Sequence, residues 1–253
     1  MIKTKYGIWI PDVPIMKPHN LPTVVKGYNG DNDMAVDMGL SSGLLWAKCD
    51  IDVTKPRGFC DTPFTYNKSF FSWGNIDGHN PKNNSFAGVY NWGSVNAAEP
   101  WYDGQPYGNT KGNTLAGDIP VDEEFDAARA NLGSPWRMPT TAEFAELFAG
   151  SIYIDATGTE IPAATTDKRV TVNGIVGLYL QSKTNGNRLF FSASGRGNGS
   201  SWSNRGTNGY YWSASFNSSR YARSLYFSSG GVNPQYNDGR YYGFAVRAVR
   251  NSR

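Results

Sequence analysis

The chain has 253 residues, a formal net charge of +3, 39% hydrophobic residues and 14% aromatic residues. This length allows one large domain or two small ones, with a sizeable core that leans on aromatic side chains. No apolar run is long enough to span a membrane, so membrane insertion is not expected. The two cysteines, Cys49 and Cys60, could pair, but two thiols make no disulfide scaffold and identify no compartment.

Positive charge is concentrated near the carboxyl end. After Lys183 the chain holds nine arginines and one aspartate, and neither lysine nor glutamate. Such a region can mark a surface that binds polyanions. Nucleic-acid binders, however, usually mix lysine with arginine in dense clusters, and these arginines are scattered. We therefore expect no specific binding of nucleic acid.

Residues 1–30 are interrupted by four prolines, which favours an extended attachment arm over a folded unit. The apolar residues 8–10 need burial, and a neighbouring subunit would supply it, so one expectation is a homo-oligomer formed through this arm. No apolar segment typical of a secretory signal peptide opens the chain, so none is expected. The folded domain is expected to cover residues 31–253.

Strand patterns begin after this arm. Residues 35–40 and 44–47 are strand-like and flank a Ser-Ser-Gly turn at 41–43, which predicts a hairpin. Residues 75–118 are rich in Asn, Gly, Pro and aromatics and show little periodicity. So long a stretch is unusual unless it is a functional insertion or a set of ordered loops.

Two helices are predicted in the middle of the chain. The first covers residues 123–132, with Asp122 as its cap. The second follows Thr140, which forms a capping box with Glu143, and runs to residue 149. Further short strands are predicted at 169–172, 176–181 and 188–193. Two helices on a strand-rich body indicate the α+β class.

The stretch 209–250 has apolar ends and a middle built from Ser, Asn, Gly, Arg, Tyr and Asp. Residues 228–231 and 237–239 have the composition of turns. Binding loops favour the same residues, because Tyr gives large contact area at low entropic cost while Ser, Gly and Asn adapt their hydrogen bonds. A display surface and an ordinary antiparallel sheet with polar turns fit this composition about equally.

Residues 221–228 alternate with a period of two, which predicts a half-buried strand. Leu225 and Phe227 are expected to face the core. Ser224 and Tyr226 are expected to face solvent, within a single exposed patch.

No catalytic motif stands out. The two histidines are His19 and His79, and His79 lies in a turn-like Asp-Gly-His-Asn segment. No zinc-spaced cysteine pair, HExxH sequence or phosphate-binding loop is present. Residues 233–238 offer oxygen atoms to calcium but a single carboxylate, so turn geometry is favoured. We expect no enzyme activity, no cofactor and no metal site.

Five segments, in order, resemble the variable proteins of diversity-generating retroelements, whose fold is C-type-lectin-like and of the formylglycine-generating-enzyme type. They are residues 36–43 with Trp46-Ala47, 71–74, 136–140 with Glu143-Phe144, 211–215, and 243–250. The reactive cysteine pair of formylglycine-generating enzymes is absent, since no cysteine follows Cys60. The Glu-Pro-Asn motif of sugar-binding C-type lectins is also absent, because Glu99-Pro100 is followed by Trp101.

The resemblance implies that residues 209–242 are a variable region. In that family, reverse transcription mutates adenines, chiefly in the Asn codons AAC and AAT, which cannot yield Lys, Glu, Gln, Met or Trp. This rule accounts for arginine without lysine, and it makes Gln235 a fixed position. The implied ligand-binding face consists of Arg220, Tyr221, Ser224, Tyr226, Ser228, Tyr236, Asn237, Asp238, Arg240, Tyr241 and Tyr242.

The resemblance implies a phage- or prophage-encoded receptor-recognition protein, located on a virion or a cell surface and directed at a protein or glycan ligand. Two alternatives stay open. One is an enzyme of the same fold with a site in the 75–118 loops, around Trp92, Trp101 and Tyr107. The other is a structural virion or adhesin subunit whose polar surface merely packs.

Overall fold

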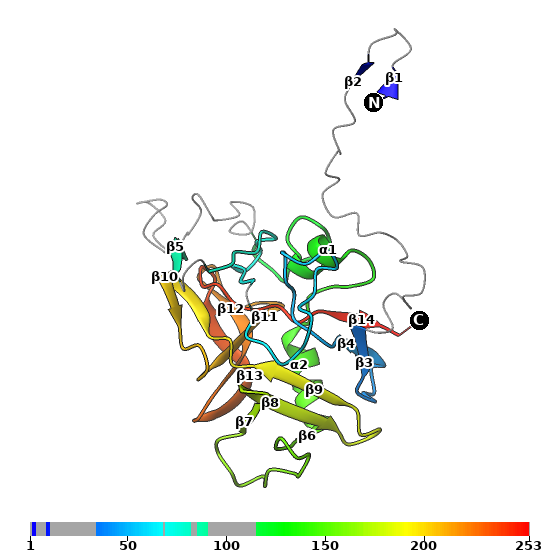
Figure 1. The fold of residues 1–253 in the computed structure, drawn as a ribbon, viewed down its shortest axis with the longest axis vertical. Coiled ribbons are helices and arrows are strands. Elements are labelled where there is room, and N and C mark those ends of the chain that lie inside the picture. The colour runs from blue at the N-terminus through cyan, green and yellow to red at the C-terminus, as the bar shows by residue number, and fades with distance from the viewer. Residues whose placement is uncertain are drawn as a thin grey trace.

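The computed structural model describes residues 34–67, 69–81 and 115–252, together with the backbone of short strands at 2–3, 9–10 and 85–90. These residues form mostly antiparallel sheets with two helices, so the predicted α+β class is confirmed (Figure 1). Strands β1 (Ile2–Lys3) and β2 (Trp9–Ile10) pair with each other. Most of the predicted arm and of the 75–118 loops lies outside the described residues.

The predicted amino-terminal hairpin is confirmed. Strand β3 (Ala35–Asp37) pairs antiparallel with β4 (Leu44–Ala47), and β4 also pairs with β14 (Val249–Asn251). The connecting turn contains Gly43, whose φ of +69° suits a residue without Cβ. Its two serines bond to the Glu146 carboxylate of the second helix, which fixes the hairpin against that helix.

Helix α1 (Ala127–Leu132) begins four residues later than predicted, because its cap is Asp126 rather than Asp122. The Asp126 carboxylate accepts from two backbone N–H groups of the first turn and from Met138 N at 3.0 Å. Asp122 accepts backbone N–H groups of a preceding turn instead. The two aspartates are alike in local sequence, and the long-range bond to Met138 distinguishes them.

Helix α2 (Thr141–Ala149) has the predicted capping box. Thr140 Oγ1 accepts from Glu143 N at 3.2 Å, and the Glu143 carboxylate accepts from Thr140 N at 2.8 Å. Arg137 Nη1 donates to the same carboxylate at 2.8 Å, so the cap is tied to the turn that precedes it.

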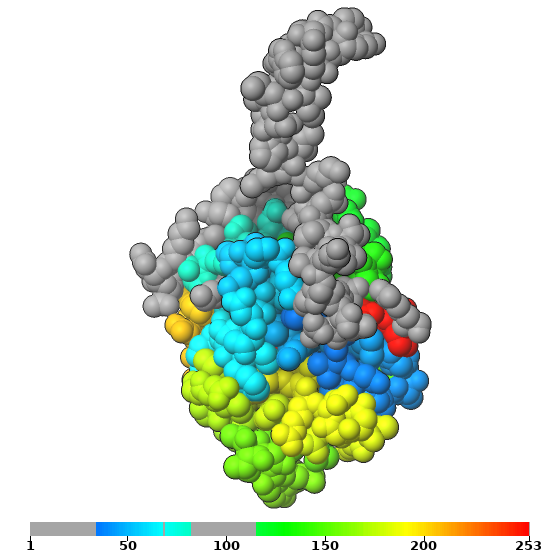
Figure 2. All heavy atoms as spheres, turned by 45° about the vertical axis from the view of Figure 1, so that its right-hand side comes forward, coloured from blue at the N-terminus to red at the C-terminus, as the bar shows by residue number. Residues whose placement is uncertain are grey.

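A four-stranded antiparallel sheet follows α2, and β8 pairs with each of the other three strands. Its strands are β6 (Ser151–Tyr153), β7 (Arg169–Val172), β8 (Ile175–Ser182) and β9 (Arg188–Ser192). The last three match the predicted strands. Figure 2 shows the β8–β9 region in yellow beside the residues of the amino-terminal hairpin in blue. Amide groups of Asn185 and Asn187 join the two by donating to Asp37 O.

The carboxyl-terminal part forms two further sheets. Strand β10 (Arg196–Ser203) pairs with β5 (Ser85–Tyr90). Strands β11 (Gly209–Phe216), β12 (Tyr221–Ser228) and β13 (Gly231–Gly239) form an antiparallel sheet in the order β11-β12-β13. We call this three-stranded sheet the carboxyl-terminal sheet.

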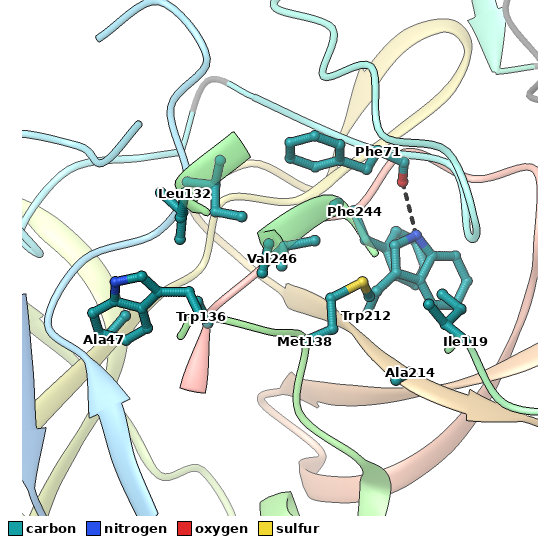
Figure 3. Packing of buried hydrophobic residues seen from close by; sticks show 14 of the residues in the cluster. Ala47, Phe71, Ile119, Leu132, Trp136, Met138, Trp212, Ala214, Phe244 and Val246 are labelled. Atoms are coloured by element: carbon teal, nitrogen blue, oxygen red, sulfur yellow. Dashed lines mark hydrogen bonds between the residues drawn. The ribbon is translucent and has the colours of Figure 1, made fainter. Parts of the chain in front are cut away.

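Both faces of the carboxyl-terminal sheet are covered by a hydrophobic core. On one face, Tyr211, Leu225 and Phe227 pack with Phe144 and Leu147 of α2. The opposite face belongs to a second core, whose members include Tyr210, Trp212, Ala222, Trp136 and Phe244. In Figure 3 the Trp212 indole lies beside Phe244, at a ring-centroid distance of 4.1 Å, and donates to Phe71 O at 2.8 Å.

Candidate ligand-binding face

The predicted strand at 221–228 is present, but one of its two faces was assigned wrongly. Leu225 and Phe227 are fully buried, as predicted. Ser224 is also fully buried, and Tyr226 is half-buried. The cause is the second core, which covers the face that Ser224 shares with Trp212, its partner in β11.

The eleven predicted face residues do not form one solvent-facing patch. They divide by burial into three groups: exposed Arg220, Tyr221, Tyr236 and Asn237; half-buried Tyr226, Ser228 and Tyr242; and buried Ser224, Asp238, Arg240 and Tyr241. They also divide between the two faces of the sheet, since alternate residues of a strand point to opposite sides. By this parity, Tyr221 and Asn237 belong to one side, and Tyr226 and Tyr236 to the other.

Arg240 is a structural residue rather than a surface anchor. It is 2% exposed, and its guanidinium lies 4.4 Å from the centre of the Trp73 ring. It donates to Leu115 O at 3.3 Å and Ser219 O at 3.2 Å, which ties the β11–β12 loop to residue 115. Tyr241 is buried as well, against the Tyr242 ring at 4.1 Å.

The expected turn at 237–239 is wrong, because these residues lie inside β13. Asn237, Asp238 and Gly239 pair with Arg223, Ala222 and Tyr221 of β12. The Ser-Gly turn at 228–231 is confirmed and already reverses the chain. Within the described part of the chain, no group of three His, Cys, Asp or Glu residues could hold a metal ion.

A row of aromatic rings runs from the second core to the surface. We call it the aromatic row, and its members are Tyr242, Phe244, Tyr210, Tyr226 and Tyr236. Successive ring centroids are 6.0, 5.0, 5.1 and 4.8 Å apart. Phe244 is fully buried, whereas Tyr236 at the far end is 41% exposed. The exposed ring is therefore held in place by packing that continues into the core.

Hydrogen bonds from amides orient two rings of the aromatic row. Asn208 Nδ2 donates to Tyr210 Oη at 3.1 Å and to Tyr226 Oη at 3.2 Å, and Asn204 Nδ2 donates to Tyr210 Oη at 2.9 Å. Both phenolic oxygens act as acceptors in these bonds, so each hydroxyl can still donate its own proton.

A buried carboxylate lies beside this row. Asp238 Oδ2 accepts from Ser224 Oγ at 2.9 Å, and its Oδ1 lies 3.7 Å from Arg196 Nη1. Burial raises the pKa of Asp238 to about 6, against the opposing effects of the serine bond and the arginine charge.

Arg196 belongs to β10, which the sequence reasoning missed. Its guanidinium lies over the rings of Tyr242, at 4.0 Å, and Tyr210, at 5.2 Å. The β10 sequence, Arg-Gly-Asn-Gly-Ser-Ser-Trp-Ser, has no periodicity, which is why no strand was predicted. The β10 sequence has the same residue types as the 209–242 segment. This similarity of composition is the signal by which β10 could have been assigned to the candidate face.

Exposure of aromatic side chains distinguishes this part of the molecule. Among the described residues, Tyr221 and Tyr236 are the two aromatic side chains classed as exposed, at 45% and 41%. Both lie on the carboxyl-terminal sheet. Exposed aromatic residues that are rimmed by polar groups are typical of binding surfaces.

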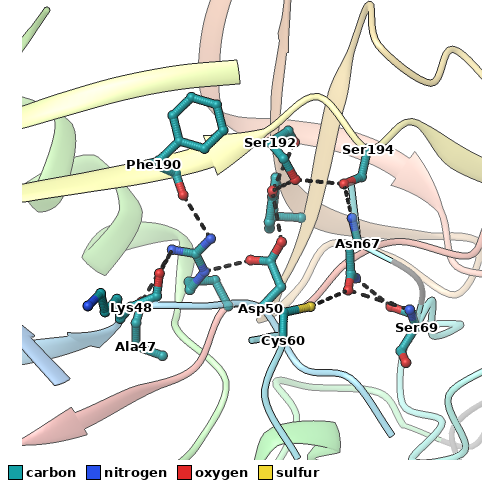
Figure 4. Close-up of polar contacts among 11 residues, drawn as sticks. Ala47, Lys48, Asp50, Cys60, Asn67, Ser69, Phe190, Ser192 and Ser194 are labelled. Carbon is teal, nitrogen blue, oxygen red and sulfur yellow. Dashed lines mark hydrogen bonds and ion pairs between the residues drawn. The ribbon is translucent and has the colours of Figure 1, made fainter. Parts of the chain in front are cut away.

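A second polar cluster, centred on Asp50, is buried (Figure 4). Asp50 Oδ1 accepts from Arg247 Nε at 2.6 Å, and Tyr211 Oη donates to Asp50 Oδ2 at 3.2 Å. Arg247 also donates to the carbonyls of Ala47 and Phe190. Arg247 and Tyr211 have no exposed surface. The cluster therefore joins segments distant in sequence and offers no surface to a substrate.

Cys49 and Cys60 are unpaired and buried in the second core. Burial raises the pKa of Cys49 to about 11, which keeps this thiol protonated. No helix among the described residues combines the length and apolarity needed to cross a membrane. The loop residues Trp92, Trp101 and Tyr107 lie outside the described residues.

Comparisons with known proteins identified no relative. No protein-family model matches the chain. No curated protein and no solved structure matches it either.

Proposed function

We propose that this chain is a ligand-binding protein of the diversity-generating retroelement type, which presents a variable surface on a C-type-lectin-like scaffold. The observation that carries the proposal is the exposure of Tyr221 and Tyr236 on a sheet whose other aromatic side chains are buried or half-buried. Tyrosine anchors tend to supply most of the energy of a binding surface. The expected role is recognition of a receptor by a virion or by a cell.

The scaffold part of the proposal is supported by the motif residues. Trp46, Phe71, Trp136, Trp212 and Phe244 come from the five segments that resemble the family, and each is at most 2% exposed. Buried residues that the chain shares with a family are expected to preserve the fold, whereas exposed positions between them can change at little cost in stability.

The burial of the eleven residues supports a smaller set of variable positions than the sequence suggests. Arg220, Tyr221, Tyr236 and Asn237 are exposed, so substitutions there remove few packing contacts. The buried residues Ser224, Asp238, Arg240 and Tyr241 would leave cavities or unpaired polar groups if replaced. We therefore propose that variation is concentrated at the exposed four and is restrained at the buried four.

A saturation scan of residues 209–242, with the chain displayed on yeast, tests this proposal. Folding is read by resistance to protease. We expect Arg220, Tyr221, Tyr236 and Asn237 to accept most residues, and the buried four to accept few. The DNA around the gene provides the second measurement: a near-identical template copy of the 209–242 coding segment, differing at adenines, beside a reverse transcriptase gene.

Two results would contradict the proposal. One is a genomic neighbourhood without template copy or reverse transcriptase, which would remove the retroelement identity. The other is a scan in which Tyr221 and Tyr236 tolerate no more substitutions than Tyr241, since the exposed tyrosines would then be serving the fold.

A further inference from the structure

We propose that Arg196 is an anion anchor of the ligand-binding face, and that the ligand presents to it a carboxylate of an acidic protein segment. This inference rests on the proposed function and assigns it a partner chemistry. It also extends the face to β10, outside the variable region.

The guanidinium of Arg196 is held in place without using its hydrogen-bond donors. It lies 4.0 Å from the Tyr242 ring centre and 5.2 Å from that of Tyr210. Its Nε has no hydrogen-bond partner in the structure, and its contact with Asp238, at 3.7 Å, is too long for a hydrogen bond. The side chain is 21% exposed, so it reaches solvent. Ring contacts fix the position of the group. Nε is buried, so the Nη groups are the donors that a ligand can reach.

A carboxylate is the group that these donors fit. Arginine presents five N–H donors in a planar fork that matches carboxylate geometry in a two-point contact. Asp238 does not already fill this role, because its closer partner is the Ser224 hydroxyl at 2.9 Å. Stacking on tyrosine rings also limits the entropy that Arg196 would lose on binding.

The surroundings favour an acidic protein segment over an acidic sugar. Exposed Tyr236 lies at the end of the same aromatic row, and tyrosine with arginine is the usual composition of energetic centres in protein interfaces. The one acidic residue after Lys183, Asp238, is buried. The guanidinium of Arg196 beside an exposed tyrosine therefore favours an acidic protein partner.

The test uses phage-displayed random dodecapeptides selected on the full chain. Selections are run on the wild type, on Arg196→Gln and on Arg188→Gln, a control in β9 whose arginine is exposed, lies 5.8 Å from the Tyr179 ring and bonds to Gln181. We expect the wild type and the control to enrich peptides rich in Asp and Glu, and Arg196→Gln to lose this enrichment.

A selected peptide is then synthesised in its acidic form and with Asn and Gln in place of Asp and Glu. In calorimetry, the Kd of the acidic peptide should rise at least about tenfold in Arg196→Gln, whereas the Kd of the amide peptide should change by less than about twofold. Arg196→Lys, which keeps the charge but not the fork, should give an intermediate loss for the acidic peptide. Melting curves of both variants establish that they are folded.

Each other outcome overturns the proposal. Peptides without acidic enrichment, or equal losses for acidic and amide peptides, refute the anchor and leave the proposed function standing. The same holds if polygalacturonate binds through Arg196 while acidic peptides do not. If every peptide that the wild type selects also binds Tyr221→Ala and Tyr236→Ala, both the anchor and the ligand-binding face are refuted.

Discussion

The aromatic row predicts a gradient of stability along its length. Replacing Tyr236 with alanine removes one ring pair, at 4.8 Å, from a side chain that is already 41% exposed. A ring pair contributes about 0.5–1.5 kcal/mol, so the free energy of unfolding should fall by about that amount. Tyr226→Ala removes two ring pairs and the Asn208 hydrogen bond, which sums to about 2–4 kcal/mol. Tyr210→Ala removes a buried ring and should cost about 3–5 kcal/mol.

Equilibrium unfolding in urea measures these differences. The midpoint should shift least for Tyr236→Ala and most for Tyr210→Ala, with an unchanged slope if the variants unfold in the same two-state manner. Each kcal/mol corresponds to about 2–4 °C in melting temperature for a domain of this size. Equal losses for Tyr236→Ala and Tyr210→Ala would refute the view that the outer ring can change while the inner rings hold the fold.

Four further predictions concern single side chains. Leu225→Ala should cost about 2–5 kcal/mol through a cavity in the core on the α2 side, and a loss below 1 kcal/mol by urea unfolding would contradict its burial. Arg247→Met should cost about 3–5 kcal/mol by the same assay, because it leaves the Asp50 carboxylate buried without its partner. Thr140→Ala should cost about 1 kcal/mol by removing the α2 cap, with a cost near zero as the contrary result. Burial raises the pKa of Asp238 in the folded protein to about 6, so its protonation stabilises the fold at pH values below about 4 and this contribution is lost as the pH rises through about 6. The melting temperature should therefore fall less between about pH 4.5 and about pH 7.5 in Asp238→Asn than in the wild type. An equal fall in both proteins would show that Asp238 is not the source of the pH dependence.

Local signals predicted the elements that local chemistry determines. The α2 capping box and the hairpin at 35–47 follow from residues a few positions apart. The start of α1 could not be predicted in this way, because Asp122 and Asp126 are equivalent in local sequence. The hydrogen bond from Met138 N to Asp126 is what distinguishes them.

The candidate site was less predictable than the fold. A period of two indicates which residues share a strand face, but not whether a second layer covers that face. Ser224 is buried because a second core lies over its side of the sheet. Arg240 looks like a surface residue by type, yet Trp73 and two carbonyls surround it. Arg196 was missed because a strand without periodicity carries it.

The pairing of β14 with β4 has a consequence for synthesis of the chain. Val249 pairs with Trp46, and Arg247 bonds to Asp50, each across about 200 residues. Contacts this remote in sequence form slowly and cannot form before the last segment leaves the ribosome. A frameshift or stop codon within 209–242 removes these partners, so a truncated product cannot complete either core. Truncated products are therefore expected to be degraded rather than to persist as folded protein.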